Sequence, residues 1–426
     1  MPLISTFGAV VALVLAIVLI IRKVVPVYAL MIGAVIGGLV GGGTLAQTVS
    51  LMRAGAQDII PAVLRILSAG ILAGALIESG AAEKIAETLV ARIGESCSLF
   101  ALALATMVLT MIGVFVDVAV ITVAPIALSL AAKIDLSRPS ILIAMIGGGK
   151  AGNIMSPNPN TIAISENMNV PLLNLMLAGV IPALSALVVT CLLARYLKKK
   201  GSRVTEDSHE ISASEKTGQD EKKSEKILFG TAIVGPLVAI LLLALRPICQ
   251  IAIDPLIALP VGGIAGLLAM GKIRILNRAM TTGLGKMGPV ALLLIGTGCL
   301  AGIISESGLS SIEQLIAMLR LPGMLLAPVS GILIGGATAS TTAGSAVASS
   351  VFGSTLLGFG LSGLAAGVMI HTGATVLDSL PHGSFFHATG GSVQMEMKER
   401  LRLIFFEAII GITQTVLATV LFGLIL

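Results

Sequence analysis

The sequence predicts an all-α polytopic membrane protein made of two inverted-topology repeats, with broken helices, re-entrant segments and about 10–14 membrane segments. Three observations predict this class. Hydrophobic residues make up 56% of the 426 positions and charged residues only 12%, whereas soluble domains carry about 25% charged residues. An octapeptide nearly recurs at Ala73–Gly80 and Ala301–Gly308, with five of its eight positions identical. Finally, the distribution of Lys and Arg gives the two halves opposite orientations.

Long apolar runs account for the membrane segments. Each approaches the roughly 20 residues that a helix needs to cross the hydrocarbon core. No positive region precedes the first run and Arg22-Lys23 follows it directly, so we expect a retained helix and not a cleaved signal peptide. Six runs carry at most one charge each: Ser5–Ile21, Val24–Gly42, Leu99–Phe115, Leu173–Ala194, Ile227–Leu245 and Leu403–Leu426.

The repeated octapeptide has similar flanks in its two copies. Each copy ends a hydrophobic segment and opens an amphipathic one, Ala81–Arg92 and Leu309–Arg320. Chance is the alternative, because small and apolar residues match easily in such a composition. An apolar chain that repeats itself once is most simply a transporter of two halves, with its substrate site where they meet.

Clusters of Lys and Arg in short loops predict the topology. They occur at Arg22-Lys23, Lys198–Lys200, Lys272–Lys286 and Lys398–Arg402. If all four clusters are cytoplasmic, as in a bacterial-type inner membrane, both termini lie outside. Each half then crosses the membrane an odd number of times, and the two halves have opposite orientation. The net charge of +5 lies largely in these loops and does not indicate a nucleic-acid partner.

The same reasoning divides the chain into three parts. Residues 1–195 and 227–426 are the N-terminal and C-terminal transmembrane repeats. The segment 196–226 holds 15 charged residues in 31 positions, eight basic and seven acidic, without an apolar period. This composition predicts a disordered cytoplasmic linker.

Asp117 is a carboxylate with an apolar segment on each side. The segments Leu99–Phe115 and Val118–Ala132 flank it, and Gly113 is the one turn signal nearby. A charge in the bilayer core costs about 2.5–3.5 kcal/mol on insertion scales, so it needs a functional reason. We expect Asp117 to take up and release a coupling proton. A loop position between two helices is the alternative.

The segment Gly147–Asn160 interrupts a hydrophobic stretch with four glycines, two prolines and three asparagines, which argues against a continuous helix. At membrane depth such backbone survives only where it lines a cavity. Exposed amides at a half-helix start would suit a carboxylate substrate. An ordinary surface loop is the alternative, and the GxxxxGK[ST] order of a phosphate loop is absent. The candidate substrate-binding residues are Lys150, Asn153, Ser156, Asn158 and Asn160.

The segment Gly335–Ser345 is a hydroxyl-rich break between apolar runs. Its candidate substrate-binding residues are Thr338, Ser340, Thr341 and Thr342. Packing is the alternative, because Ser and Thr inside helices often satisfy only their own backbone.

The segment His371–Ser384 contains the last candidates. Asp378, Ser379 and His382 are candidate substrate-binding residues, and Asp378 is also a candidate for proton coupling together with Asp117. The histidines of this region, with His387 beyond it, also allow a zinc site as an alternative. Neither an HExxH motif nor paired cysteines support that alternative, and we expect no metal and no cofactor.

At these residues the chain resembles the gluconate–proton symporters, the gluconate permease family within the ion transporter superfamily. Phe115–Val118 is similar to the aromatic-acidic-valine element of the family, and Gly152–Pro159 to its proline-rich break. Ala337–Ala343 and Val376–Ser379 are similar to its Thr-rich and Val-Asn-Asp-Ser elements. The resemblance implies proton-coupled uptake of sugar acids or related hydroxy-carboxylates. It also implies a site formed by two broken helices and opposed re-entrant segments.

The chain departs from the family pattern at several positions. Pro157-Asn158-Pro159 stands where members commonly have Pro-His-Pro, and Leu377 stands where they have Asn. Lys150 and His382 have no equivalent in that pattern. These departures bear on the substrate more than on the fold.

The sequence therefore predicts a secondary active transporter and not an enzyme, with no catalytic residues. Its expected partners are the lipid bilayer, a small anionic substrate such as gluconate, and a coupling ion, a proton or else sodium. A permease for citrate-like or dicarboxylate anions with Na⁺ coupling is the alternative. A membrane-embedded enzyme, a channel and a homodimeric assembly also stay open.

Overall fold

The computed structural model describes residues 3–204, 227–249, 251, 253–306 and 323–425 of the chain. Regular secondary structure in these residues is helical, and an isolated β-bridge joins Ser137 and Arg203. The predicted all-α class is confirmed.

The described helices of the first half correspond in order to those of the second half. The pair α3–α4 corresponds to the long helix α16, the hairpin α6–α7 to α18–α19, and the broken helix α8–α9 to α20–α21. The first half has α1 (Thr6–Ile21), α2 (Pro26–Val40), α3 (Leu45–Asp58), α4 (Ile60–Glu78), α5 (Ala81–Ile93), α6 (Ser98–Met111), α7 (Val116–Ile134), α8 (Arg138–Asn153), α9 (Pro159–Asn167), α10 (Leu172–Ala178) and α11 (Val180–Leu197). The second has α13 (Phe229–Ala232), α14 (Val234–Cys249), α15 (Pro255–Ala269), α16 (Leu276–Ser305), α18 (Leu326–Thr338), α19 (Thr341–Gly358), α20 (Gly363–Ala374), α21 (Ser384–Ser392) and α22 (Met397–Thr419).

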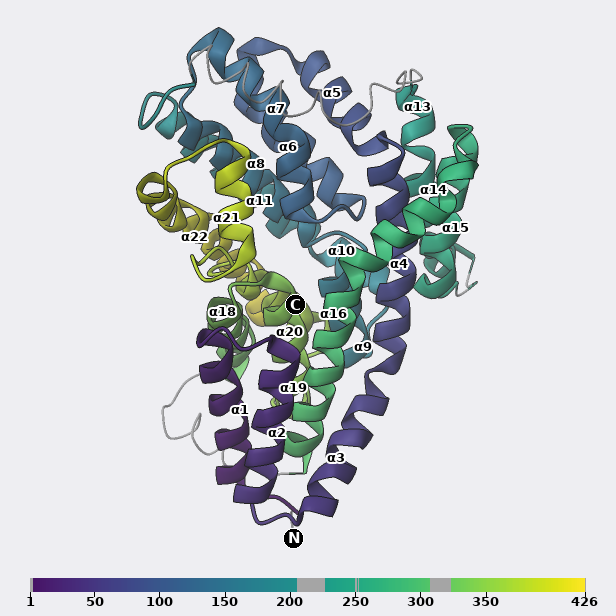
Figure 1. Ribbon diagram of the computed structural model, residues 1–426, viewed down its shortest axis with the longest axis vertical. Helices are drawn as coiled ribbons and strands as arrows, with labels where there is room; N and C mark the ends of the chain where they lie inside the picture. The colour runs from purple at the N-terminus through teal and green to yellow at the C-terminus, as the bar shows by residue number, and fades with distance from the viewer. Residues whose placement is uncertain (1–2, 205–226, 250, 252, 307–322, 426) are drawn as a thin grey trace.

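The helices that carry the repeated octapeptide, α4 and α16, pack against each other at the centre of the molecule (Figure 1). Glycine permits their close approach. A Cβ on Gly55 of α3 would lie 2.2 Å from the carbonyl oxygen of Gly298, and one on Gly74 would lie 1.9 Å from that of Ala279. Because these contacts follow opposite orders along the two segments, α3–α4 and α16 run antiparallel, as inverted repeats require.

The two halves also exchange contacts reciprocally. Helix α2 packs against α16 of the other half, and its counterpart α15 packs against α4. Likewise α9 packs against α19, and its counterpart α21 packs against α7. Each half therefore completes the packing of the other, which makes the interface between the repeats part of the core.

Apolar helices in the described residues are long enough to cross a membrane. Large apolar side chains such as Phe7, Leu192 and Phe405 are exposed on the helix surfaces, where hydrocarbon would cover them. The chain is an integral membrane protein, and its orientation stays a prediction. Five segments have the length and hydropathy of spans: Ile60–Glu78, Val116–Ile134, Leu172–Leu197, Ile273–Ser305 and Met397–Leu424.

The predicted linker 196–226 is described only in its first part. Helix α11 continues through Tyr196 to Leu197. Beyond it, the carbonyl oxygens of Lys198 and Ser202 accept hydrogen bonds from the amides of Ser137 and Arg138. Residues 205–226 lie outside the described residues, as does the amphipathic segment predicted at 309–320.

A charged cluster joins three helices at one edge of the central pair. Arg65 of α4 donates two hydrogen bonds to Asp254, from Nε to Oδ1 at 2.9 Å and from Nη2 to Oδ2 at 2.6 Å. It also forms an ion pair with Glu166 of α9. Asp254 caps the N-terminus of α15, so this one arginine connects α4 to helices of both halves.

Replacing Arg65 by Gln is expected to lower the stability of the detergent-purified protein. Two carboxylates would lose a partly buried partner, a loss that costs about 1–3 kcal/mol. Arg278→Gln is the matched control, because Arg278 also pairs with a glutamate but its side chain is 78% exposed, against 23% for Arg65. Thermal unfolding followed by light scattering tests this prediction. Equal melting temperatures for the two variants would contradict it.

Candidate functional site

Two helical hairpins reverse direction inside the molecule. The α6–α7 hairpin turns at Gly113, whose φ of +104° is readily adopted by glycine, and Phe115 leads into α7. The α18–α19 hairpin turns at Ala339, which has a left-handed φ of +46°. That conformation is unfavourable for alanine, so the surrounding structure must hold it.

Two broken helices face these hairpins. In the first half, α8 stops after Asn153 and α9 starts at Pro159, with the break at residues 154–158. Pro157 and Pro159 have no amide hydrogen, and Pro159 occupies the first helical position, where none is needed. In the second half, residues 375–383 separate α20 from α21.

Both hairpin tips and both breaks contribute to a single cavity of about 250 Å³, which we call the central cavity. Its walls come from both halves of the chain, and they are rich in hydroxyl and amide groups. The residues that line it are Phe115, Val116, Asp117, Asn153, Asn158, Pro159, Asn160, Thr338, Ala339, Ser340, Thr341, Thr342, Asp378, Gly383, Ser384 and Phe385.

Four helices begin at the central cavity, namely α7, α9, α19 and α21. Asn158 caps α9 by accepting hydrogen bonds from the amides of Asn160 and Thr161, and Ser340 caps α19. No side chain caps α7 or α21. Helix N-termini carry a partial positive charge and free amide donors, so this arrangement favours an anion in the cavity.

Polar side chains connect the two halves across the cavity wall. Thr342 of α19 donates a hydrogen bond of 2.6 Å from Oγ1 to Oδ1 of Asn160 on α9. Asn158 in turn donates from Nδ2 to the side-chain oxygen of Asn153 at 2.6 Å. A substrate in the cavity would thus contact groups whose orientation depends on both repeats.

Asp378 is held by three side chains from three elements. Its Oδ1 accepts hydrogen bonds from Lys150 Nζ at 2.6 Å and from Ser379 Oγ at 2.9 Å. Its Oδ2 accepts one from Thr341 Oγ1 at 2.6 Å. Lys150 also donates to the carbonyl oxygen of Thr375 at 2.7 Å. The carboxylate therefore joins α8 of the first half to the break and the hairpin of the second half.

The environment of Lys150 differs from the sequence expectation. Residues 147–153 continue α8, so the break is shorter than predicted, and Lys150 lies inside a helix with its side chain 1% exposed. It does not line the central cavity. The glycines of this segment permit close contact with α6, since a Cβ on Gly148 would lie 2.0 Å from the carbonyl oxygen of Ala103. Packing therefore outweighs the low helix propensity of glycine here.

Asp117 lies in the first turn of α7, which rules out the predicted loop alternative. Its side chain is partly buried and lines the central cavity. Among the described residues, it has no hydrogen-bond or ion-pair partner. Thr338 also lines the cavity and donates a hydrogen bond from Oγ1 to the carbonyl oxygen of Ile334 in its own helix.

The remaining sequence candidates lie behind or beside the cavity wall. Ser156 is buried and its hydroxyl has no partner among the described residues. His382 is exposed, with Nε2 3.1 Å from the carbonyl oxygen of Ala337, and His387 lies 2.8 Å from that of Pro381. His371 is buried within α20. Ser379 does not line the cavity and donates a hydrogen bond to Asp378, which does.

Sequence reasoning missed two features of the site. Ser384 lines the cavity at the start of α21, and the helix start after Pro381 and Gly383 could have indicated it. Gln414 of α22 donates a hydrogen bond to Thr375 Oγ1 and so supports the second break. Gln414 lies in a long apolar run, which was the available signal.

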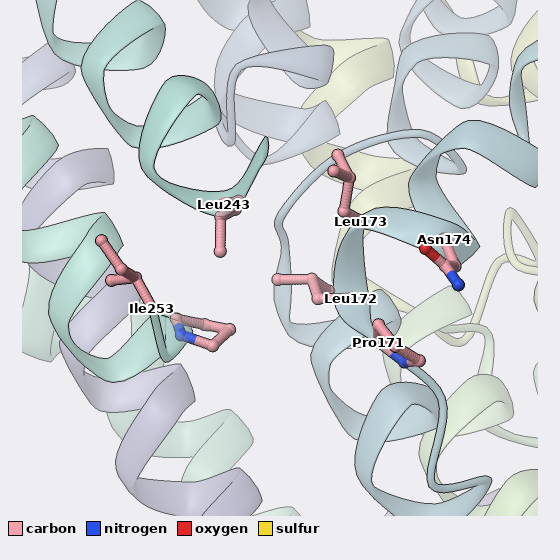
Figure 2. A pocket seen from close by; sticks show the side chains of 7 residues that line it. Pro171, Leu172, Leu173, Asn174, Leu243 and Ile253 are labelled. Atoms are coloured by element: carbon pink, nitrogen blue, oxygen red, sulfur yellow. The ribbon is translucent and has the colours of Figure 1, made fainter. Parts of the chain in front are cut away.

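A second cavity, of about 230 Å³, lies between α10 and the α14–α15 connection (Figure 2). Leu172, Leu173, Leu243 and Ile253 provide most of its lining, and Asn174 is its one amide side chain. It has none of the hydroxyl and carboxylate groups found in the central cavity. The central cavity is therefore the stronger candidate for the site of a polar anion.

By sequence and by fold, the chain is similar to permeases and other transporters. A model of the GntP family of permeases matches residues 1–425. An uncharacterized transporter of Haemophilus influenzae is 57% identical over 426 residues, which cover 99% of both chains. An uncharacterized permease of the same organism is 28% identical over 162 residues, which cover 37% of this chain and 33% of the permease. The crystal structure of the YdaH transporter of Alcanivorax borkumensis has a similar fold, with a TM-score of 0.60, 15% identity and coverage of 89% and 87% of the two chains.

Proposed function

Since this chain belongs to the GntP family of permeases and is a membrane transporter, we propose that it is a proton symporter for a small hydroxy-carboxylate, gluconate or a related sugar acid. The substrate is bound in the central cavity. Uptake proceeds across a bacterial-type inner membrane, with both termini outside.

The convergence of four helix N-termini on the central cavity carries this proposal. The uncapped starts of α7 and α21 leave amide donors for a carboxylate. Asp117 would oppose an anion by its own charge, which a bound proton removes. Loading of the proton and loading of the anion therefore favour each other, as symport requires.

The side chains around these helix starts suit a polyhydroxylated molecule. Thr341, Thr342 and Ser340 present hydroxyl groups, and Asn153 and Asn160 present amides. Each of these groups both donates and accepts hydrogen bonds, as sugar hydroxyls do. A substrate without hydroxyls would leave their remaining donor and acceptor positions unused and displaced from water, which costs affinity.

Uptake by proteoliposomes tests the proposal. With an inward proton gradient and no sodium, labelled gluconate should accumulate above its external concentration. Abolition of this accumulation by a protonophore, and competition by other sugar acids but not by alkyl carboxylates of similar length, would support it. Accumulation driven only by sodium, or with citrate as the preferred substrate, would contradict it.

Thr342→Val is expected to weaken substrate binding by about 1 kcal/mol, or roughly fivefold in affinity, because the hydrogen bond to Asn160 and a cavity hydroxyl are lost. Thr355→Val is the matched control in the same helix, since the buried hydroxyl of Thr355 has no partner among the described residues. Isothermal titration of detergent-purified protein measures both. If Thr355→Val weakens substrate binding as much as Thr342→Val does, Thr342 is not part of the binding site.

A further inference from the structure

The side chain of Lys150 occupies a position with the chemistry of a cation-binding site. Its ammonium group is buried between Asp378 Oδ1 at 2.6 Å and the carbonyl oxygen of Thr375 at 2.7 Å. Thr375 follows the last residue of α20. A free carbonyl at an unwound helix end beside a carboxylate is the ligand set that transporters offer to Na⁺.

Further oxygen atoms surround the same carboxylate. Thr341 and Ser379 donate hydrogen bonds to Asp378, and both hydroxyl oxygens retain lone pairs for a cation. Among the described residues, Asp378 is the one carboxylate that forms an ion pair with Lys150. Each of these oxygen-bearing residues belongs to the second half of the chain, whereas the positive charge is supplied by α8 of the first half.

We propose that the ammonium group of Lys150 is a tethered cation that fills a monovalent-cation site at Asp378, and that this makes the transporter independent of sodium. An ammonium and Na⁺ carry the same charge and both bind oxygen atoms. A lysine delivers this charge permanently, so no ion has to be taken from solution to order the second break and the tip of α18–α19. The inference rests on the proposed function, because Asp378 and Thr341 line the central cavity.

The inference predicts that removing the side chain converts the site into one that binds sodium. In Lys150→Ala the carboxylate, the carbonyl and the hydroxyls stay in place around an open volume, with the charge of Asp378 uncompensated. Na⁺ should therefore stabilise this variant by mass action. We expect its melting temperature in detergent to be low in choline chloride and to rise saturably with NaCl. That of the wild type should be the same in both salts at equal ionic strength.

Three further variants make the test specific. Lys286→Ala removes an exposed lysine of α16 and should show no response to sodium. The double variant Lys150→Ala/Asp378→Asn lacks the carboxylate charge that would bind the cation, so it should also show no response to sodium. Lys150→Ser, with an added hydroxyl ligand, should respond as Lys150→Ala does. Failure of both single Lys150 variants to gain stability from NaCl, or an equal gain in the double variant, would overturn the inference.

Substrate uptake separates this inference from the proposed function. Lys150→Ala in proteoliposomes should take up substrate at least about tenfold faster in NaCl than in choline chloride, because the ion restores the charge that the site requires. The melting experiment needs no substrate. Sodium-dependent stabilisation without gluconate uptake would contradict the proposed substrate alone, and gluconate uptake without any sodium effect would contradict the tethered cation alone.

Discussion

Asp378→Asn is expected to abolish substrate exchange as well as proton-driven accumulation. The carboxylate lines the central cavity and accepts hydrogen bonds from Lys150, Ser379 and Thr341. An amide has no negative charge to balance the buried ammonium of Lys150, and breaking a buried ion pair costs about 3–5 kcal/mol. Exchange of labelled for unlabelled substrate across proteoliposomes without a gradient measures the effect directly.

Loss of folding has to be separated from loss of the site in this variant. The double variant Lys150→Ala/Asp378→Asn removes both charges, so we expect it to regain most of the melting temperature lost by Asp378→Asn. Exchange should stay absent, because the cavity still lacks the carboxylate. Full exchange by the double variant would show that Asp378 serves only to neutralise Lys150.

Asp117→Asn is expected to abolish uphill accumulation while leaving exchange measurable. The side chain lines the cavity at the start of α7 and has no hydrogen-bond or ion-pair partner among the described residues. A group whose proton occupancy differs between the two facing states is what couples the gradient to transport. Asparagine removes that proton site, whereas loss of a charge at a helix N-terminus costs only about 0.3–1 kcal/mol.

Asp135→Asn is the matched control at the opposite end of the same helix. Asp135 has a left-handed backbone with φ of +53°, which asparagine adopts readily, and it pairs with Arg203 at the surface. The Asp135→Asn variant should accumulate substrate at the wild-type rate. Accumulation at that rate in Asp117→Asn as well would exclude Asp117 from coupling and leave Asp378 as the candidate carrier.

Much of the fold was accessible from the sequence because its signals are local. The apolar run at Ser5–Ile21 corresponds closely to α1, and the run at Leu403–Leu426 overlaps α22, which begins earlier, at Met397. Two of the places where helices stop were marked by sequence signals, the prolines and glycines around Asn158 and the hydroxyl-rich segment around Ser340. Such signals operate within one turn of backbone, and neighbouring residues are sufficient to produce them.

Other features could not be predicted because they depend on contacts between distant residues. Lys150 and Asp378 are 228 positions apart, and Thr342 and Asn160 are 182 apart. The three glycines before Lys150 lie in a helix because neighbouring helices pack tightly against them, α11 at Gly147, α6 at Gly148 and α7 at Gly149. A single sequence contains the residues of these pairs but not the information that they meet.

The sequence by itself determined the membrane class, the twofold repeat and the segments where helices break. Hydropathy and backbone chemistry act locally, and a repeat is visible in the letters themselves. Only the tertiary structure decided that four helix N-termini meet in one cavity and that Lys150 is bound behind it by Asp378 and is not exposed in it. Antiparallel packing of α4 on α16, together with the reciprocal contacts of α9 with α19 and of α21 with α7, brings the two halves together and sets which polar groups face each other.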